Sequence, residues 1–124
     1  MDCIFCSIIK GDIPCYKIYE DEKFLAFLDI ANDVEGHTLV IPKSHTANVA
    51  TCESQLFGEL MQTAKKIFEH YQSLGYDAAN FAINSGKAAG QEVEHLHVHI
   101  LPRKMEKRET DLAKIAQKLR MDNE

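Results

Sequence analysis

The stretch His95-Leu96-His97-Val98-His99 places a histidine at every second position. Side chains two residues apart on a β-strand share a face and lie about 6.8 Å apart. We therefore predict a strand over Glu94–Leu101, with three imidazoles on one face and Leu96, Val98 and Ile100 in the core. Buried imidazoles need polar partners, so such a cluster indicates a functional site rather than packing. The spacing alone leaves open nucleophilic chemistry or a zinc site that uses two of the histidines.

The segments around this strand predict an α+β fold with a mainly antiparallel five-stranded sheet and one long helix. The other expected elements are strands at Tyr16–Glu20, Phe24–Asp29, His37–Pro42 and Ala79–Asn84, a helical turn at Cys3–Lys10, and helices at Glu53–Leu74 and Thr110–Arg120. Apolar residues recur at helical spacing in the long helix, for which Thr51 is the expected N-cap and Gly75 the stop signal. His70 lies outside every motif, and we expect it to be solvated.

Size and composition bound the function. The chain has 124 residues, a net charge of −5 and 45% hydrophobic residues, which fits one small globular domain. It has neither a long apolar run nor a secretory signal, so we expect a cytoplasmic protein without a membrane partner. Lysines and arginines form no stripe, which argues against nucleic acid but not against a small phosphorylated ligand.

The cysteines divide into a pair and two single residues. Cys3 and Cys6 have the spacing of metal ligands, but two ligands do not complete a structural zinc site. A redox pair of this spacing would follow a first strand, and none is expected here. We interpret Cys15 and Cys52 as small buried hydrophobic residues.

The histidine run resembles the signature of the histidine triad (HIT) family of nucleotide hydrolases and transferases. Further landmarks of that family stand in order: Cys3-Ile-Phe-Cys6, Leu25-Ala-Phe-Leu-Asp29, Gly36-His-Thr-Leu-Val-Ile-Pro42, Asn84 and Gly90-Gln91. The resemblance covers residues 3–102 and is greatest to the branch that hydrolyses purine nucleoside phosphoramidates. We accordingly divide the chain into a HIT domain, residues 1–102, and a C-terminal extension, residues 103–124, with a short amphipathic helix.

This resemblance implies a covalent mechanism. His97 would attack the α-phosphorus and form a transient nucleotidyl–imidazole, which suits a side chain that is neutral and nucleophilic near pH 7. His99 and His37 would donate hydrogen bonds to the phosphate and orient the nucleophile. Asn84 and Gln91 would supply neutral donors to the phosphate oxygens and the leaving atom. The family also implies a homodimer.

The same resemblance implies a nucleoside pocket. Asp29 would accept both ribose hydroxyls, and four apolar side chains would sandwich the purine: Phe5, Ile8, Phe27 and Ile30. For Ile8 and Ile30, a plain core position is an equally good interpretation. Glu92, two residues after the loop glycine Gly90, occupies a position where that branch commonly has serine. A carboxylate there repels phosphate unless it turns outward or meets a cationic leaving group, so the leaving-group preference stays open.

By the same resemblance, His45 and His95 would join the cysteine pair in a structural zinc site, with no organic cofactor. Three functions then compete. The first is a nucleotide hydrolase or transferase that acts through His97, and the second is a non-catalytic nucleotide-binding regulator. The third is a zinc-dependent hydrolase that holds a catalytic metal on the triad.

Overall fold

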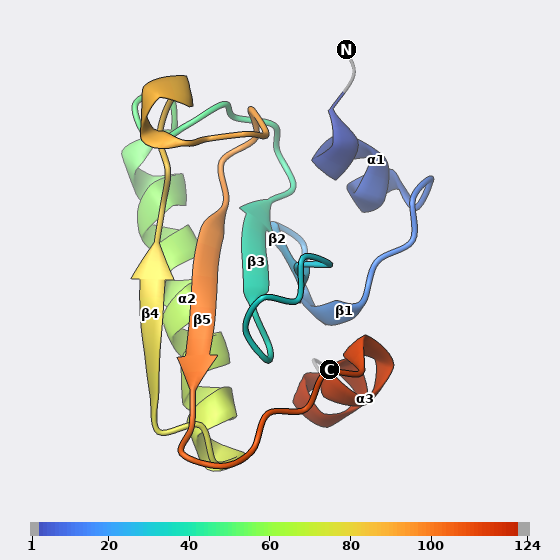
Figure 1. The fold of residues 1–124 in the computed structure, drawn as a ribbon. Helices are drawn as coiled ribbons and strands as arrows, with labels where there is room; N and C mark the ends of the chain where they lie inside the picture. The colour runs from blue at the N-terminus through green and yellow to red at the C-terminus, as the bar shows by residue number, and fades with distance from the viewer. Residues whose placement is uncertain (1–2, 122–124) are drawn as a thin grey trace.

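Five strands form one antiparallel sheet in the order β1-β2-β3-β5-β4 (Figure 1). The computed structural model describes residues 3–121, so the ends of the predicted domain and extension, residues 1–2 and 122–124, lie outside it. The elements are α1 (Ile4–Lys10), β1 (Lys17–Glu20), β2 (Phe24–Leu28), β3 (Thr38–Pro42), α2 (Ser54–Ser73), β4 (Ala78–Ala82), the 3-10 turn η1 (Lys87–Ala89), β5 (Val98–Arg103) and α3 (Leu112–Leu119). The predicted α+β class and antiparallel sheet are confirmed.

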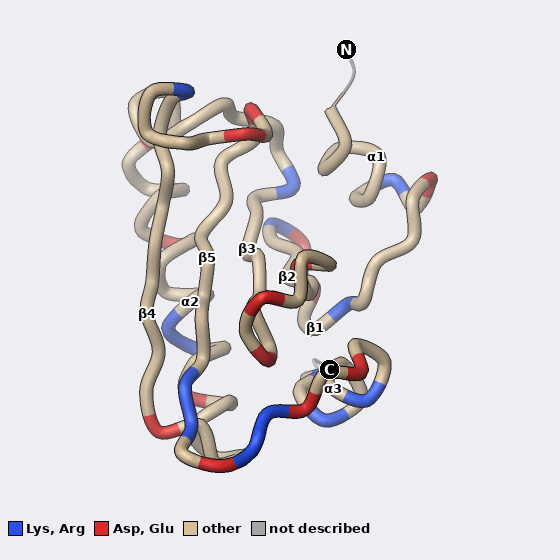
Figure 2. Tube along the Cα trace, in the orientation of Figure 1, with Lys and Arg blue, Asp and Glu red and all other residues tan. Residues whose placement is uncertain are grey.

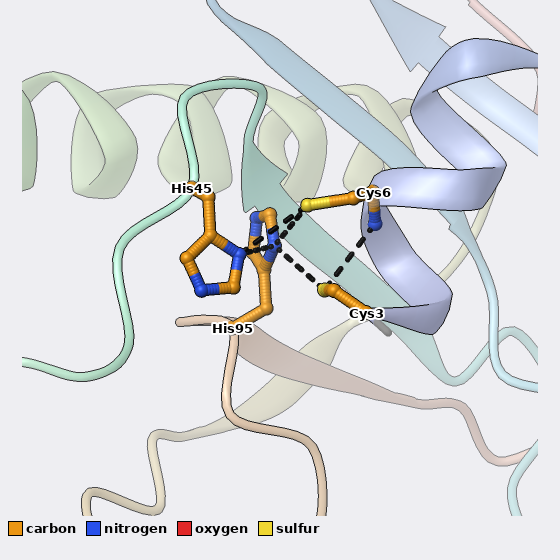
Figure 3. A group of neighbouring side chains, drawn as sticks. All are labelled: Cys3, Cys6, His45 and His95. Atoms are coloured by element: carbon orange, nitrogen blue, oxygen red, sulfur yellow. Dashed lines mark hydrogen bonds between the residues drawn. The ribbon is translucent and has the colours of Figure 1, made fainter. Parts of the chain in front are cut away.

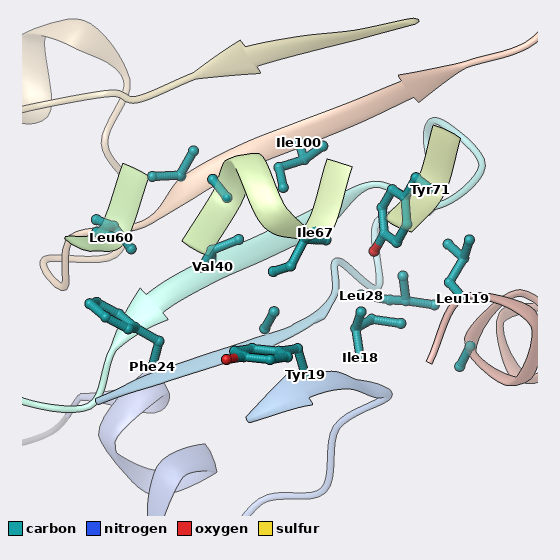
Figure 4. Packing of buried hydrophobic residues seen from close by; sticks show 14 of the residues in the cluster. Ile18, Tyr19, Phe24, Leu28, Val40, Leu60, Ile67, Tyr71, Ile100 and Leu119 are labelled. Carbon is teal, nitrogen blue, oxygen red and sulfur yellow. The ribbon is translucent and has the colours of Figure 1, made fainter. Parts of the chain in front are cut away.

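Apolar side chains cover both faces of the sheet because alternate residues of a strand point in opposite directions. On one face, Val40 of β3 and Ile100 of β5 pack with α2 and α3 in the main core (Figure 4). On the other face, Leu39 and Ile41 of β3 pack with α1 in a smaller cluster. The three histidines of the run share this second face, on the same side of the sheet as α1.

The histidine run only partly belongs to the sheet. β5 begins at Val98 rather than at Glu94, because the Leu96 N–H donates to the Thr46 carbonyl oxygen at 2.8 Å instead of joining a ladder. The predicted alternation nevertheless holds, since Leu96, Val98 and Ile100 are all fully buried. The strand runs on to Arg103 by pairing with β4 alone, which tolerates Pro102 where only one side of the strand is bonded.

The start of α2 corrects one prediction. Glu53, not Thr51, occupies the N-cap, and its side chain makes no cap hydrogen bond. The Thr51 hydroxyl instead accepts from the Asn48 N–H at 3.2 Å in the preceding turn. Gly75 follows the last helical turn with φ +103°, as its predicted role as stop signal requires.

The C-terminal segment packs on the main core through α3, whose Ile115, Ala116 and Leu119 are buried. His70 is half-buried rather than solvated, because its Nε2 lies 3.0 Å from the Leu119 carbonyl oxygen, to which it donates. Gly36 permits this packing: it has φ +79°, and an added Cβ would lie 3.0 Å from Leu119 Cδ1. The extension therefore contributes to the core of the protein.

Charged residues are concentrated in the segment that joins the sheet to α3. Basic and acidic residues alternate along the segment between β5 and α3 (Figure 2). No helix within residues 3–121 has the length and apolar character needed to cross a bilayer. Cys15 and Cys52 are half-buried at the margins of the two apolar clusters rather than fully buried, which corrects the expectation for both.

Candidate functional site

The backbone fixes the tautomer of His97. Its Nδ1 lies 2.7 Å from the carbonyl oxygen of His95, and a carbonyl only accepts, so Nδ1 carries the proton and Nε2 keeps its lone pair. Burial lowers the pKa of His97, since the charged ring would lose its water, although the bond to His95 opposes this. His97 is therefore a neutral imidazole with a free Nε2, which is the form that a nucleophile requires.

His95 shows the opposite tautomer. Its Nε2–H donates to the carbonyl oxygen of Pro42 at 2.8 Å, so its Nδ1 is the nitrogen with the lone pair. The ring is fully buried, and burial lowers its pKa. A neutral ring with one nitrogen held by a carbonyl is the usual state of a histidine that ligates a metal.

The free Nδ1 of His95 belongs to a group of four donor atoms that lie within 4.8 Å of one another (Figure 3). Cys3 Sγ lies 3.4 Å and His45 Nδ1 3.2 Å from His95 Nδ1, and Cys6 Sγ lies 3.3 Å from His45 Nδ1. Tetrahedral zinc, with bonds of about 2.0 Å to nitrogen and 2.3 Å to sulfur, separates its ligands by roughly 3.3 to 3.8 Å. The four predicted metal ligands are thus brought together, and their geometry fits Zn²⁺.

A second histidine group begins at a residue that the sequence did not indicate. The Nδ1–H of His37 donates to Asp33 Oδ1 at 2.7 Å, and His37 Nε2 lies 2.9 Å from His99 Nδ1. Asp29 Oδ2 lies 3.7 Å from the same His37 Nε2. Asp33 is an exposed loop aspartate, and its position four residues before His37 carries no recognisable motif.

His99 ends this chain of hydrogen bonds. Among the buried side-chain nitrogen and oxygen atoms of the described residues, its Nε2 is the one that has no hydrogen-bond partner. Burial lowers the pKa of His99 to about 4, and the neighbouring rings of His97 and His37 act in the same direction. A buried polar atom without a partner is rare in folded proteins and marks a place where a ligand atom fits.

The predicted nucleoside residues differ in exposure. Phe5 is buried and lies edge-on to Phe27 and to His97, with ring centroids 5.6 and 5.1 Å apart. Ile8 is half-buried against the same cluster. Ile30 is 77% exposed, which removes the plain core interpretation for that side chain. Asp29 is half-buried at the end of β2.

The loop before the histidine run is held by Gln91. Its Oε1 accepts from the Gly86 N–H at 2.7 Å, and its Nε2 donates to the carbonyl oxygens of Ala47 and Val93 at 2.6 and 2.9 Å. These bonds occupy the amide, and among the described residues none joins Gln91 to His37, His97 or His99. Gly90 has φ +91°, and an added Cβ would lie 3.8 Å from Asn84 Nδ2.

Glu92 turns outward, and this direction avoids the repulsion expected near a phosphate. The side chain is exposed and lines a surface cavity of about 440 Å³ beside the metal group, together with Cys3, Ile4, His45, Ala47, Val93 and Glu94.

Comparison with known proteins supplies the classification. The family model described as HIT domain matches residues 10–106. The chain belongs to the histidine triad family. It is 43% identical over 103 residues to the adenosine 5'-monophosphoramidase of Schizosaccharomyces pombe. The aligned region covers 83% of this chain and 75% of that protein. It is 47% identical over 106 residues to protein hit of Bacillus subtilis, with 82% and 71% covered.

A similar solved structure belongs to a zinc-bound protein of this family. The crystal structure of a Zn-bound histidine triad family protein from Mycobacterium smegmatis matches with a TM-score of 0.90 and 39% identity, over 97% of this chain and 91% of that one. In this chain, the donor atoms of the Cys/His group could hold a metal ion.

Proposed function

We propose that this HIT protein is a nucleotide hydrolase or transferase that cleaves a purine nucleoside 5'-phosphate derivative at its α-phosphorus. The substrate class is a phosphoramidate or a dinucleoside polyphosphate. The observation that carries the proposal is the buried, neutral His97, whose Nδ1–H is held by the His95 carbonyl and whose Nε2 is free. Similarity to an adenosine 5'-monophosphoramidase supports the nucleotide class.

The reaction proceeds in two displacements. The lone pair of His97 Nε2 attacks the α-phosphorus, and the electron pair of the breaking bond moves to the leaving nitrogen or oxygen, which takes up a proton. Water then attacks the phosphorus of the nucleotidyl–imidazole, and the P–N bond breaks with its electron pair returning to His97 Nε2. The nucleoside monophosphate leaves, and the proton lost by the water replaces the one given to the leaving group. His99 and His37 lie beside the nucleophile His97. The ring centroids of His97 and His99 are 4.9 Å apart.

The remaining residues bind the nucleotide. We assign the ribose hydroxyls to the Asp29 carboxylate and the purine to the side of Phe5 and Phe27, with Ile8 and Ile30 at its margin. Asn84, Gly90, Gln91 and Glu92 form the loop that surrounds the phosphate and leaving group. For Gln91 this requires an exchange of its bonds to the Ala47 and Val93 carbonyls.

Cys3, Cys6, His45 and His95 would hold Zn²⁺ as a structural ion. When bound, it cross-links the start of α1 to the loop after β3 and to the histidine run. Phe5 lies on the first turn of α1 and touches His97, so this anchoring positions the aromatic wall of the nucleotide pocket.

We also propose a homodimer in the cytoplasm, with a HIT domain at residues 1–102 and an extension at 103–124. β4 is an edge strand, and its Phe81 is 43% exposed although it stacks edge-on with Phe68. Such an edge is suited to a partner. The four cysteines are free thiols, as is usual in a reducing compartment.

Trapping the intermediate tests the proposal. The protein is mixed with an adenosine phosphoramidate or diadenosine polyphosphate, quenched in base and analysed by mass spectrometry. We expect a nucleotidyl adduct on His97 in the wild type and none in His97→Ala. Turnover by His97→Ala at the wild-type rate would exclude the covalent mechanism, and adduct-free nucleotide binding by the wild type would favour the regulator.

One observation supports the zinc-dependent hydrolase as a second candidate. Donor atoms of Asp29, His37 and His99 lie within 4.8 Å of one another, a two-histidine, one-carboxylate set that suits a divalent metal. Under this alternative a chelator abolishes turnover at once. Under the covalent mechanism, turnover survives until loss of the structural metal unfolds the protein.

A further inference from the structure

A carboxylate outside the HIT signature stands at the start of the hydrogen-bond chain that ends on His99. Asp33 lies in the loop between β2 and β3, and its Oδ1 accepts from His37 Nδ1 at 2.7 Å. We propose that Asp33 is a positioning residue of the active site, whose carboxylate determines where the protons lie on His37 and His99. This inference rests on the proposed function, because it assigns the proton that the leaving group receives.

The carboxylate fixes the proton positions because each hydrogen bond in the chain needs one donor and one acceptor. Asp33 only accepts, so His37 always keeps the proton on Nδ1. With no additional proton, His37 Nε2 accepts from His99 Nδ1–H across 2.9 Å, and His99 Nε2 has a lone pair only. With one additional proton, His37 Nε2 donates to His99 Nδ1, and His99 Nε2 becomes a donor. The added proton thus becomes available at the buried atom that lacks a partner.

The positive charge of this second state lies on His37. His37 is flanked by the carboxylates of Asp33 at 2.7 Å and Asp29 at 3.7 Å. His99, by contrast, faces the rings of His97 and His37 and is buried, which lowers its pKa to about 4. The geometry therefore separates the two tasks: His99 presents the proton, and His37 carries the charge beside Asp33.

The proton balance closes during the first displacement. The leaving nitrogen or oxygen takes the electron pair of the breaking bond and the proton of His99 Nε2. His99 then takes the proton of His37 Nε2 onto its own Nδ1, and His37 becomes neutral with its Nδ1–H still on Asp33. No other oxidant, reductant or acid is needed.

The loop holds Asp33 in place even though its side chain is 56% exposed. Asn32 has φ +52°, an uncommon conformation for a residue other than glycine. Its Nδ2 donates to the Thr110 carbonyl oxygen at 2.7 Å, and the Arg108 guanidinium donates to its carbonyl oxygen and to its Oδ1. The segment between β5 and α3 thereby fixes the loop that carries the carboxylate.

Substitution of Asp33 tests the inference on the full-length protein. Asp33→Asn retains an oxygen that accepts from His37 but removes the charge, and Asp33→Ala removes both. Asp77→Asn is the matched control, since Asp77 is an exposed aspartate directly before β4. Turnover of an adenosine phosphoramidate is measured from pH 5 to 9, with thermal melts to show that each variant folds.

We expect Asp33→Asn to lower kcat by about ten- to a hundredfold at neutral pH, which is part of the roughly 10²- to 10⁴-fold that general acid catalysis contributes, with KM within twofold of wild type. Its pH profile of kcat should also differ from that of the wild type, because the substitution removes a negative charge that lies 2.7 Å from the His37 ring. Asp33→Ala should lose more, and Asp77→Asn should match the wild type. In proton NMR, the His37 Nδ1–H resonance should move upfield in Asp33→Asn, which reports the hydrogen bond independently of turnover.

An Asp33→Asn variant with the kcat and pH profile of the wild type would overturn the inference. A rise in KM at constant kcat would also overturn it, because Asp33 would then act in substrate binding. A wild-type protein that turns over no substrate would instead refute the proposed function, and the two failures are thus distinguishable.

Discussion

His95 and His97 are two residues apart, but the backbone holds opposite nitrogens of their rings. His95 donates from Nε2 to Pro42 and offers Nδ1 to the metal group, whereas His97 donates from Nδ1 to His95 and keeps Nε2 free. Both rings are neutral because of burial. The difference shows that the role of a histidine in this run depends on which nitrogen a main-chain carbonyl binds. In the proposed function, the His95 side of the run is a metal-binding scaffold and the His97 side carries the chemistry.

The largest effect should come from the catalytic side. His97→Ala removes the nucleophile, and we expect kcat to fall by about 10⁴-fold or more. Zinc content and melting temperature should stay near those of the wild type, as measured by atomic emission and calorimetry. A variant that loses zinc as well would break the distinction between the two sides.

The metal side should respond in the converse way. Cys6→Ser removes one ligand, and we expect loss of zinc and a melting temperature lower by about 10 °C or more, since metal binding contributes directly to folding. Burial and the neighbouring Cys3 raise the pKa of the Cys6 thiol, so zinc must displace a proton there. Zinc affinity should therefore weaken as pH falls, and competition with a chromogenic chelator at several pH values measures this.

Glu35 supports the loop that carries Asp29 and Asp33. Burial acts to raise the pKa of its carboxyl, but hydrogen bonds from Lys104, Tyr76 and the Glu109 N–H outweigh it and hold the pKa below 4.5. A lowered pKa stabilises the fold above the ordinary value, and this stability is lost as pH falls through the folded-state pKa. Glu35→Gln should therefore cost about 2 kcal/mol at pH 7 and less near pH 3.

Urea unfolding at the two pH values checks this prediction, with Glu22→Gln, at an exposed position, as the control. An equal cost at both pH values would show that shape, rather than charge, determines the contribution of Glu35.

The smallest effect should come from Arg108. Arg108→Ala releases Asn32, the neighbour of Asp33, but removes only an exposed side chain, so we expect a two- to fivefold fall in kcat, equivalent to about 0.4–1 kcal/mol. Lys107→Ala is the control, because Lys107 is the exposed neighbour of Arg108. Steady-state kinetics of both variants would sharpen the comparison by showing whether the C-terminal segment serves the catalytic side alone. An unchanged kcat in Arg108→Ala would contradict the coupling between this segment and Asp33.

The sequence predicted the parts of this arrangement that depend on periodicity. Alternation placed Leu96, Val98 and Ile100 in the core, and helical spacing placed α2 within one residue at each end. It did not predict bonds between distant segments. The Leu96 N–H turns to Thr46, which shortens the strand, and the Thr51 hydroxyl serves a turn rather than a helix.

The site residues with a motif were predicted, and those that depend on contacts between distant segments were missed. Ligand spacing and family resemblance indicated all four residues of the metal group, which the structure brings together. Asp33 was missed because a single loop aspartate has no periodic or motif signal, and its contact with His37 depends on a turn held by Arg108. The same applies to His70, whose partner is a carbonyl on a helix 49 residues away.

The acceptor that orients His97 is a main-chain oxygen, and no point substitution deletes a main-chain oxygen. The tautomer of the nucleophile is therefore robust to mutation at residue 95, even where the metal ligand itself is exchanged. The proton on His37, in contrast, depends on a side chain that a single nucleotide change replaces. Substitutions should therefore leave the tautomer of His97 unchanged more often than they leave the proton supply to the leaving group unchanged.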